Sequence, residues 1–253
     1  MAMNPLIRDW AGKRVWLVGA SSGIGAEMAR QLAVRGARIA LSGRNREALE
    51  ALGLHEALLL PCDANDSAAL AACRQAMLAR WGGIDLVIYL AGDYVPMGAK
   101  DFAIETAERL FAVNFTAAAK LTGCVLKDLP AGGGIAFVAS VAGYRGLPKA
   151  IAYGPGKAAL IHFAECLYLD LAPEKIGVWL INPGFVATRL TARNDFAMPA
   201  LLTVEQAAEA TLAGFAAGGF EIHYPKRFTR LLKLLSLLPY RWYFPLIRRI
   251  TGA

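Results

Sequence analysis

The chain has 253 residues, of which 56% are hydrophobic and 19% charged, and its formal net charge is +7. This length suits one large domain, and so high an apolar fraction excludes an intrinsically disordered chain. The four cysteines and three histidines are scattered without a CxxC pair, so we expect reduced thiols in a cytoplasmic protein, no disulfide framework and no metal site. The N-terminus has no secretory signal pattern, and no uncharged apolar run reaches the length of about 18 residues that a membrane-spanning helix needs.

The excess positive charge lies at the C-terminus. Residues 226–253 carry no acidic side chain and seven basic ones: Lys226, Arg227, Arg230, Lys233, Arg241, Arg248 and Arg249. The remaining 20 basic residues equal the 20 acidic ones, so we expect no nucleic-acid partner.

Short apolar runs alternate with longer segments of helical periodicity. In chain order the patterns predict strand 14–20, helix 24–35, strand 38–43, helix 45–52, strand 57–62, helix 66–81, strand 85–92, helix 104–128, strand 134–140, helix 154–172, strand 176–182, helix 203–217 and strand 220–225. Regular alternation of this kind indicates a single-domain, doubly wound α/β Rossmann fold with a parallel seven-stranded sheet. Several strands are apolar throughout, as expected when helices cover both faces of the sheet. Chemistry is then expected beyond the carboxyl ends of the strands.

Three glycines follow the first strand. Gly19, Gly23 and Gly25 stand where a strand turns sharply into a helix, and this spacing allows positive φ, close approach of a phosphate and tight helix packing. The start of the helix offers free N–H groups and a positive dipole end. The pattern predicts a dinucleotide site.

The end of the second strand indicates which dinucleotide. An NAD site would carry an acidic side chain here for the ribose 2′-hydroxyl, but residues 43–46 read Gly-Arg-Asn-Arg. The guanidinium of Arg44 suits a 2′-phosphate, so NADP is favoured over NAD. The alternative is that Arg44 is only a solvated loop residue.

Six elements in order then resemble one family. The glycine pattern, Leu-Ala-Gly at 90–92, Asn114, Ser140, Tyr153-x3-Lys157 and Pro-Gly at 183–184 resemble the short-chain dehydrogenase/reductase family over residues 14 to about 225. The resemblance implies that Asp63 contacts the adenine and that Thr188 contacts the nicotinamide carboxamide. It implies further cofactor contacts from Ser21, Ser22, Ile24, Ala91, Gly92, Tyr153, Lys157, Pro183, Gly184 and Val186.

The expected catalytic residues follow from the acid/base chemistry of tyrosine. A free phenol has a pKa of about 10, and a lysine ammonium one helical turn away is expected to lower it. We therefore expect Tyr153 to be the acid/base and Lys157 its tuner, with Ser140 orienting the substrate oxygen. The family resemblance implies that Asn114 holds a water molecule, which links Lys157 to solvent. Gly154, Pro155 and Gly156 are tolerable only if the helix begins at about Tyr153.

The chain departs from the usual family pattern at the cofactor. Val18 stands where a threonine is usual, and Tyr89 and Leu90 replace two asparagines. These changes predict looser turns rather than lost binding.

A lid is expected after Gly184. Its apolar residues predict a hydrophobic carbonyl or hydroxyl substrate, a class that includes lipid-like compounds; they are Phe185, Leu190, Phe196, Met198 and Leu201. The helices 104–128 and 154–172 are apolar round much of their circumference, and the resemblance then implies a homodimer or homotetramer.

The tail, residues 226–253, is predicted to be a basic amphipathic helical segment appended to a catalytic domain of residues 1–225, with Pro239 ending its first helix. Two alternatives stay open for it. Either it lies on an anionic membrane surface, which would make the protein peripheral at the inner face of a membrane, or its leucines pack on the body or on a partner subunit.

These patterns favour an NADP-dependent oxidoreductase that transfers a hydride between the nicotinamide and a hydrophobic substrate. A non-catalytic NADP-binding sensor or scaffold, recruited to membranes by the tail, is the alternative.

Overall fold

A parallel sheet of seven strands in the order β3-β2-β1-β4-β5-β6-β7 forms the centre of the protein. The computed structural model describes residues 2–194 and 198–252. The strands are β1 (Arg14–Val18), β2 (Arg38–Ser42), β3 (Leu58–Leu59), β4 (Leu86–Tyr89), β5 (Gly134–Val138), β6 (Gly177–Pro183) and β7 (Glu221–Tyr224). The predicted doubly wound α/β fold is confirmed.

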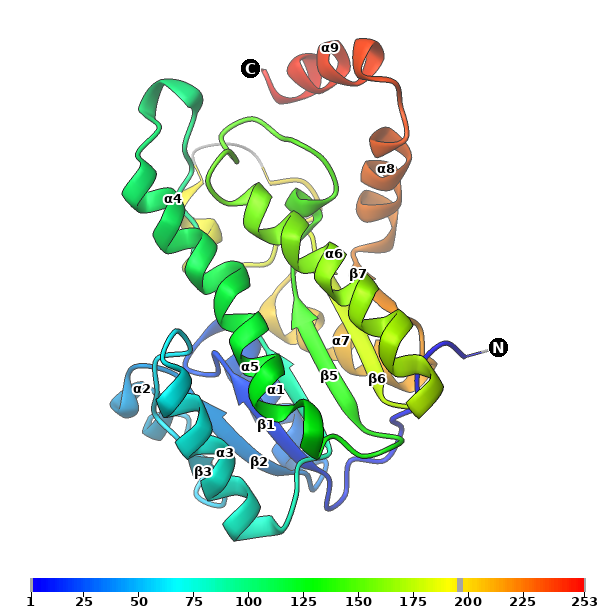
Figure 1. The fold of residues 1–253 in the computed structure, drawn as a ribbon. Helices are drawn as coiled ribbons and strands as arrows, with labels where there is room; N and C mark the ends of the chain where they lie inside the picture. Colours follow the sequence, from blue (N-terminus) through cyan, green and yellow to red (C-terminus); the bar gives the residue numbers. More distant parts are fainter. Residues whose placement is uncertain (1, 195–197, 253) are drawn as a thin grey trace.

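Helices cover both faces of the sheet (Figure 1). They are α1 (Gly23–Val34), α2 (Arg46–Glu50), α3 (Ser67–Trp81), α4 (Ile104–Phe111), α5 (Ala117–Val125), α6 (Gly154–Leu171), α7 (Val204–Ala217), α8 (Lys226–Ser236) and α9 (Tyr240–Thr251). In β1, Trp16 and Val18 pack with α3, α5 and α6, whereas Val15 and Leu17 pack with α1 and α7. Both sides of the strand are buried, which explains why it is apolar throughout.

The helix predicted over 104–128 contains a π-helical turn at Ala112–Thr116. The extra residue in this turn places Asn114 inside, where its Nδ2 donates to Leu110 O at 2.9 Å. By length and composition alone the stretch Ile104–Asp128 is apolar enough to cross a membrane. In this fold the stretch packs on one face of the sheet, where Ala117 and Leu121 are completely buried.

The strand predicted at 57–62 is shorter in the structure, where β3 has two residues. Leu60 N still donates to Leu41 O and Cys62 N to Gly43 O, so the extended pairing continues. Pro61 lies between these two donors, so the position without an N–H faces away from β2, at the open edge of the sheet, where proline is tolerated.

Helix α6 begins at Gly154 with Tyr153 as its N-cap and proline in its first turn. This confirms the predicted start. Proline and glycine are harmless there, because the first N–H groups of a helix have no intrahelical partner.

The tail forms two helices at the end of the sheet to which the strands point (Figure 1). Pro239 separates them and is the N-cap of α9. Helix α8 follows β7 directly, and α9 lies against the loop after β5, where Tyr243 Oη donates to Gly146 O at 2.8 Å.

Candidate active site

The turn between β1 and α1 has the shape of a phosphate cradle. Gly19 has φ 98°, and a Cβ there would lie 2.3 Å from Ala91 N, while a Cβ at Gly25 would lie 2.4 Å from Gly19 O. Ser22 is the N-cap of α1 but makes no side-chain cap, so the helix start keeps its N–H groups for a ligand. A Cβ at Gly23, where φ is 58°, would lie 3.3 Å from Thr188 Cγ2. These residues fit the pyrophosphate of a dinucleotide.

Backbone bonds close this turn. Val18 O accepts from Leu90 N at 2.7 Å and from Ala91 N at 2.9 Å. Tyr89 is buried, and its hydroxyl donates to Val113 O in the π-helical turn at 2.5 Å. Hydrogen bonds therefore hold the turn at Val18 and Tyr89, the positions that depart from the usual pattern.

Arg44 lies exposed just after β2. The two residues that follow it already have partners within the protein. Asn45 caps α2 by accepting a hydrogen bond from Ala48 N, and Arg46 forms an ion pair with Glu50 at 2.8 Å. In the part of the chain that the structure describes, Arg44 makes no hydrogen bond or ion pair with protein. Its guanidinium is thus available to an anionic ligand.

Ser21 and Asp63 flank the same end of the sheet. A Cβ at Gly43 would lie 3.4 Å from Ser21 Oγ, so the first two strand-to-helix turns touch. Asp63 is exposed beyond β3, and its carboxylate accepts from the backbone N and the Nδ2 of Asn65 at 2.9 and 3.1 Å.

The predicted catalytic side chains meet beyond β5. Ser140 follows this strand, and its Oγ accepts from Ala142 N at 3.1 Å and also hydrogen-bonds to Tyr153. Lys157 is only 3% exposed, and its Nζ donates to Val138 O at 2.9 Å and lies 5.7 Å from the centroid of the Tyr153 ring.

Burial dominates the acidity of this pair. Burial raises the pKa of Tyr153 to about 12, against a smaller lowering by the Ser140 hydrogen bond. Burial lowers the pKa of Lys157 to about 7. The expectation that Lys157 pulls the Tyr153 pKa down is therefore wrong for this arrangement, since desolvation opposes the phenolate and the lysine directs its hydrogen bond to a backbone carbonyl.

Asn114 lies beside the same space. Its Nδ2 donates to Asp93 O at 2.8 Å, while its buried Oδ1 has no hydrogen-bond partner among the described residues. A Cβ at Gly92 would lie 2.9 Å from this Oδ1 and 3.5 Å from Lys157 Nζ. Glycine at position 92 thus keeps open the space that the asparagine and the lysine share.

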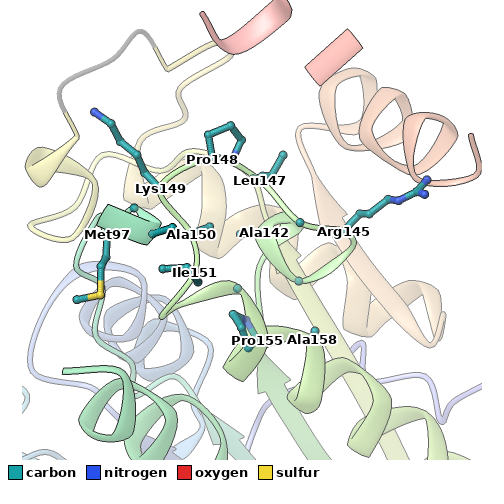
Figure 2. A pocket seen from close by; sticks show the side chains of 15 residues that line it. Met97, Ala142, Arg145, Leu147, Pro148, Lys149, Ala150, Ile151, Pro155 and Ala158 are labelled. Atoms are coloured by element: carbon teal, nitrogen blue, oxygen red, sulfur yellow. The ribbon is translucent and has the colours of Figure 1, made fainter. Parts of the chain in front are cut away.

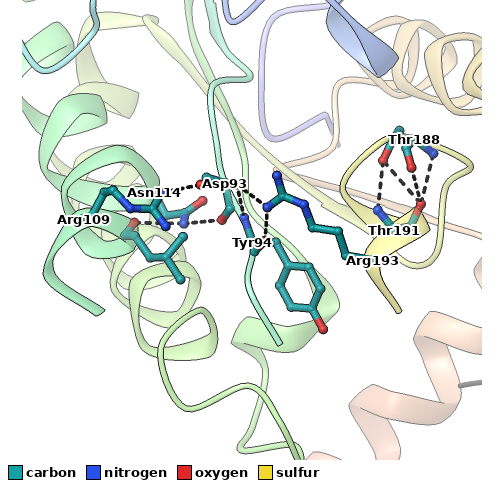
Figure 3. Close-up of polar contacts among 8 residues, drawn as sticks. Asp93, Tyr94, Arg109, Asn114, Thr188, Thr191 and Arg193 are labelled. Carbon is teal, nitrogen blue, oxygen red and sulfur yellow. Dashed lines mark hydrogen bonds and ion pairs between the residues drawn. The ribbon is translucent and has the colours of Figure 1, made fainter. Parts of the chain in front are cut away.

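The sequence interpretation missed an ion-pair cluster around Asp93, which follows β4 (Figure 3). The carboxylate contacts Arg109 of α4 at 2.5 Å and Arg193 of the lid at 2.9 Å. Burial alone would raise the pKa of Asp93, but hydrogen bonds from Arg109, from Tyr94 N and from Arg193 outweigh it and lower that pKa. The Tyr94 ring meets the Tyr153 ring edge-on, with the centroids 5.1 Å apart. The cluster ties the lid to the loop whose Tyr94 contacts Tyr153.

The segment after β6 covers the glycine turn. Gly184 N donates to Tyr224 O at 2.7 Å, and Val186 is buried. Thr188 N donates to Thr191 Oγ1 at 3.0 Å. Arg189 donates to Ser22 Oγ at 3.4 Å. Among the predicted lid residues, Phe196 lies outside the described part of the chain.

A cavity of about 550 Å³ adjoins the start of α6 (Figure 2). Its walls include Met97, Leu147, Pro148, Ile151 and Pro155. The lining is largely apolar and includes Gly154 and Pro155, which follow Tyr153 in the chain, whereas Tyr153 itself is not one of the wall residues.

Comparisons with known proteins agree with this geometry. Residues 13–197 match the family described as short chain dehydrogenase. An uncharacterised oxidoreductase of Myxococcus xanthus strain DK1622 is 33% identical over 231 residues, which cover 88% of this chain and 91% of that protein. The dehydrogenase/reductase SDR family protein 7-like of Anopheles gambiae is 30% identical over 197 residues, 73% of this chain and 62% of that protein. A short-chain dehydrogenase/reductase of Burkholderia phymatum, crystallised with NAD, shares the fold with a TM-score of 0.82 and 22% identity over 90% of this chain and 94% of its own.

The buried Lys157 predicts a pH dependence of stability. Its pKa of about 7 in the folded chain lies below the ordinary 10.5, so between these values the unfolded chain holds the additional proton. The free energy of unfolding of the wild type should therefore rise with pH relative to Lys157→Met, by up to about 1.4 kcal/mol per pH unit. Urea unfolding without cofactor, from about pH 7.5 to 9.5, measures this difference. The exposed Lys127→Met is the control and should keep the wild-type slope, whereas equal slopes for wild type and Lys157→Met would contradict the prediction.

Proposed function

The chain belongs to the short-chain dehydrogenase/reductase family, whose fold binds a nicotinamide cofactor, and on that premise we propose an NADP-dependent oxidoreductase that acts on a hydrophobic carbonyl or hydroxyl compound. The observation that carries the proposal is the meeting of Ser140, Tyr153 and Lys157 close to Gly92 and the glycine turn. An apolar cavity adjoins the first turn of the same helix, α6.

The protein side of the reaction is proton transfer and orientation, while bound NADPH supplies the hydride. With a pKa of about 12, Tyr153 keeps its proton at neutral pH and is a donor for the oxygen of a carbonyl substrate. Ser140, which already hydrogen-bonds to Tyr153, orients that oxygen. A proton on Lys157 would put positive charge 5.7 Å from the Tyr153 ring and stabilise the phenolate left after transfer.

Asn114 is proposed to return the proton. Its Oδ1 is a buried acceptor that faces the space shared with Lys157, and a water held there would connect the lysine to solvent. The π-helical turn supports this role, because it points the side chain inward while Nδ2 stays fixed on Asp93 O and Leu110 O.

The cofactor contacts are proposed along the same edge of the sheet. Gly19, Gly23 and Gly25 with Ser21, Ser22 and Ile24 would take the pyrophosphate, Asp63 the adenine, and Thr188 the carboxamide. Ala91, Gly92, Pro183, Gly184 and Val186 would line the nicotinamide end. Preference for NADP rests on Arg44, whose exposed guanidinium is available for a 2′-phosphate.

A hydrophobic substrate is supported by the apolar lining of the cavity at the first turn of α6. All four cysteines are free, which supports a reducing, cytoplasmic location.

We also propose a homodimer or homotetramer that packs through α5 and α6. Leu169, on the outer face of α6, exposes 72% of its surface.

Replacing Tyr153 by Phe tests the mechanism. Loss of the proton donor should lower kcat for NADPH-dependent reduction of a hydrophobic ketone or aldehyde by about 10²–10⁴-fold. NADPH binding, followed by fluorescence titration, should stay near the wild-type value. Tyr168→Phe, which removes a hydroxyl remote from the site, serves as the control. A Tyr153→Phe enzyme with most of its activity would overturn the assignment.

Replacing Arg44 by Asp tests the cofactor preference. Exchange of a guanidinium for a carboxylate should shift the ratio of kcat/KM for NADPH over NADH toward NADH by at least about tenfold. Arg38→Asp makes the same charge change at the other end of β2 and should leave the ratio unchanged. A ratio that does not move in Arg44→Asp would remove the case for NADP.

The assembly is tested by light scattering. Wild type should have the mass of a dimer or tetramer, and Leu169→Arg should shift it toward the monomer, because a charge would be buried at the interface. Val34→Arg alters another exposed apolar residue, outside α5 and α6, and should not change the mass. A wild-type monomer would contradict the proposal.

A further inference from the structure

The tail helices turn an apolar surface toward solvent. The exposed large hydrophobic side chains of the two helices and the residue after α8 include six that expose between 53% and 80% of their surface: Leu231, Leu234, Leu237, Trp242, Phe244 and Ile250. We call these six residues the tail surface. The alternative that the leucines of α8 pack on the body is therefore wrong for Leu231, Leu234 and Leu237, within the chain that the structure describes.

Polar contacts with the body set this orientation. Lys233 of α8 forms an ion pair with Glu221 of β7, and the same carboxylate accepts from Tyr144 Oη at 2.6 Å. Thr229 is fully buried against His223, with its Oγ1 2.5 Å from Nδ1. A helix that covers a protein core normally packs its apolar face inward. Polar residues of α8 contact the body together with Phe228, whose ring lies 5.6 Å from that of Phe185. Leu231, Leu234 and Leu237 are nevertheless left outside.

Arg145 fixes the joint between the two helices. Its guanidinium donates to Ser236 O at 2.7 Å and to Leu238 O at 2.5 Å, and it stacks on Tyr240 and Tyr243 at 4.3 and 4.2 Å from their ring centroids. Arg145 also belongs to the wall of the cavity, and Figure 2 shows it pointing from there toward α8. The tail is thus held on the loop that lines the proposed substrate site.

The charge around the tail surface identifies the occupant. Arg227, Arg230, Arg241 and Arg249 are exposed beside the apolar residues, and residues 226–253 contain no acid. Two copies meeting through this surface would bring like charges together, which disfavours a self-contact. Leucine and tryptophan with arginine at their margins match the interface of an anionic bilayer.

The cavity opens at the same end of the molecule. Ile151, a wall residue, is 43% exposed, and Phe102 and Ile104 at the start of α4 are 47% and 52% exposed. These segments and α9 all lie beyond the carboxyl ends of the strands (Figure 1). A membrane under the tail surface would therefore lie close to the mouth of the cavity.

We propose that α8 and α9 dock the protein on an anionic lipid surface and that its hydrophobic carbonyl or alcohol substrate enters the cavity from that bilayer. Docking stands on the tail alone, whereas substrate entry rests on the proposed oxidoreductase function.

Vesicle flotation of the full chain tests docking. Wild type should float with phosphatidylcholine vesicles that contain about 30% phosphatidylserine, and binding should fall at least about tenfold with pure phosphatidylcholine or high salt. Leu234→Ser/Leu237→Ser should bind at least about tenfold more weakly. The control Met3→Ser/Val34→Ser removes two exposed apolar side chains elsewhere and should bind as wild type.

Three outcomes would overturn docking. One is no flotation of the wild type, and another is equal flotation of wild type and Leu234→Ser/Leu237→Ser. The third is a wild-type oligomer that the leucine variant dissociates, without vesicle binding by either protein, which would assign the tail surface to a second copy.

Kinetics with two substrates test entry from the bilayer. For a long-chain ketone or aldehyde dissolved in the anionic vesicles, the leucine variant should lose at least about fivefold in kcat/KM. For a short, water-soluble carbonyl compound it should keep the wild-type value. Equal loss on both substrates, or none on either, would overturn entry from the bilayer. If wild type reduces neither compound, the proposed function fails, and the flotation result still decides docking.

Discussion

The close approach of Gly19 to the backbone of Ala91 is the contact on which the site depends. Any side chain at position 19 would collide with that backbone, so glycine alone lets β1 and β4 end in contact. The sheet order places these two strands side by side where successive crossovers change direction, and ligands of open α/β sheets bind at that point. From this contact the chain runs to Gly92 and then to Asp93, which binds Asn114, Arg109 and the lid.

Burial controls the acid/base groups more than their mutual attraction does. Tyr153 keeps its proton because the buried phenolate would be poorly solvated. The same loss of solvation lowers the pKa of Lys157 to about 7, so this lysine loses its proton near neutral pH. The hydrogen bond from Lys157 to Val138 O compensates part of the cost of burying an amine. A tyrosine that holds its proton at neutral pH is suited to protonating a substrate oxygen during reduction.

The tail and the catalytic loop share one set of contacts. Arg145 belongs to the wall of the cavity and holds the joint between α8 and α9, while Tyr144 and Lys233 share Glu221. The residues that these contacts join are far apart in the chain but lie on one side of the molecule. This attachment leaves Leu231 and Leu234 of α8 free to meet another apolar phase, which is unusual for a helix packed on a domain.

The sequence by itself determined the alternation of strands and helices, the glycine turn, the start of α6 at Tyr153 and the amphipathic, basic character of the tail. Each of these depends on spacing within a short segment, which periodicity and local backbone preferences report directly. Tertiary structure decided the π-helical turn at Asn114 and the ion pairs of Asp93 with Arg109 and Arg193, since the latter residues are distant in the chain. It also decided the pKa values of Tyr153 and Lys157 and the outward direction of the tail leucines. Burial and orientation are set by everything packed around a side chain, and no local pattern contains that information.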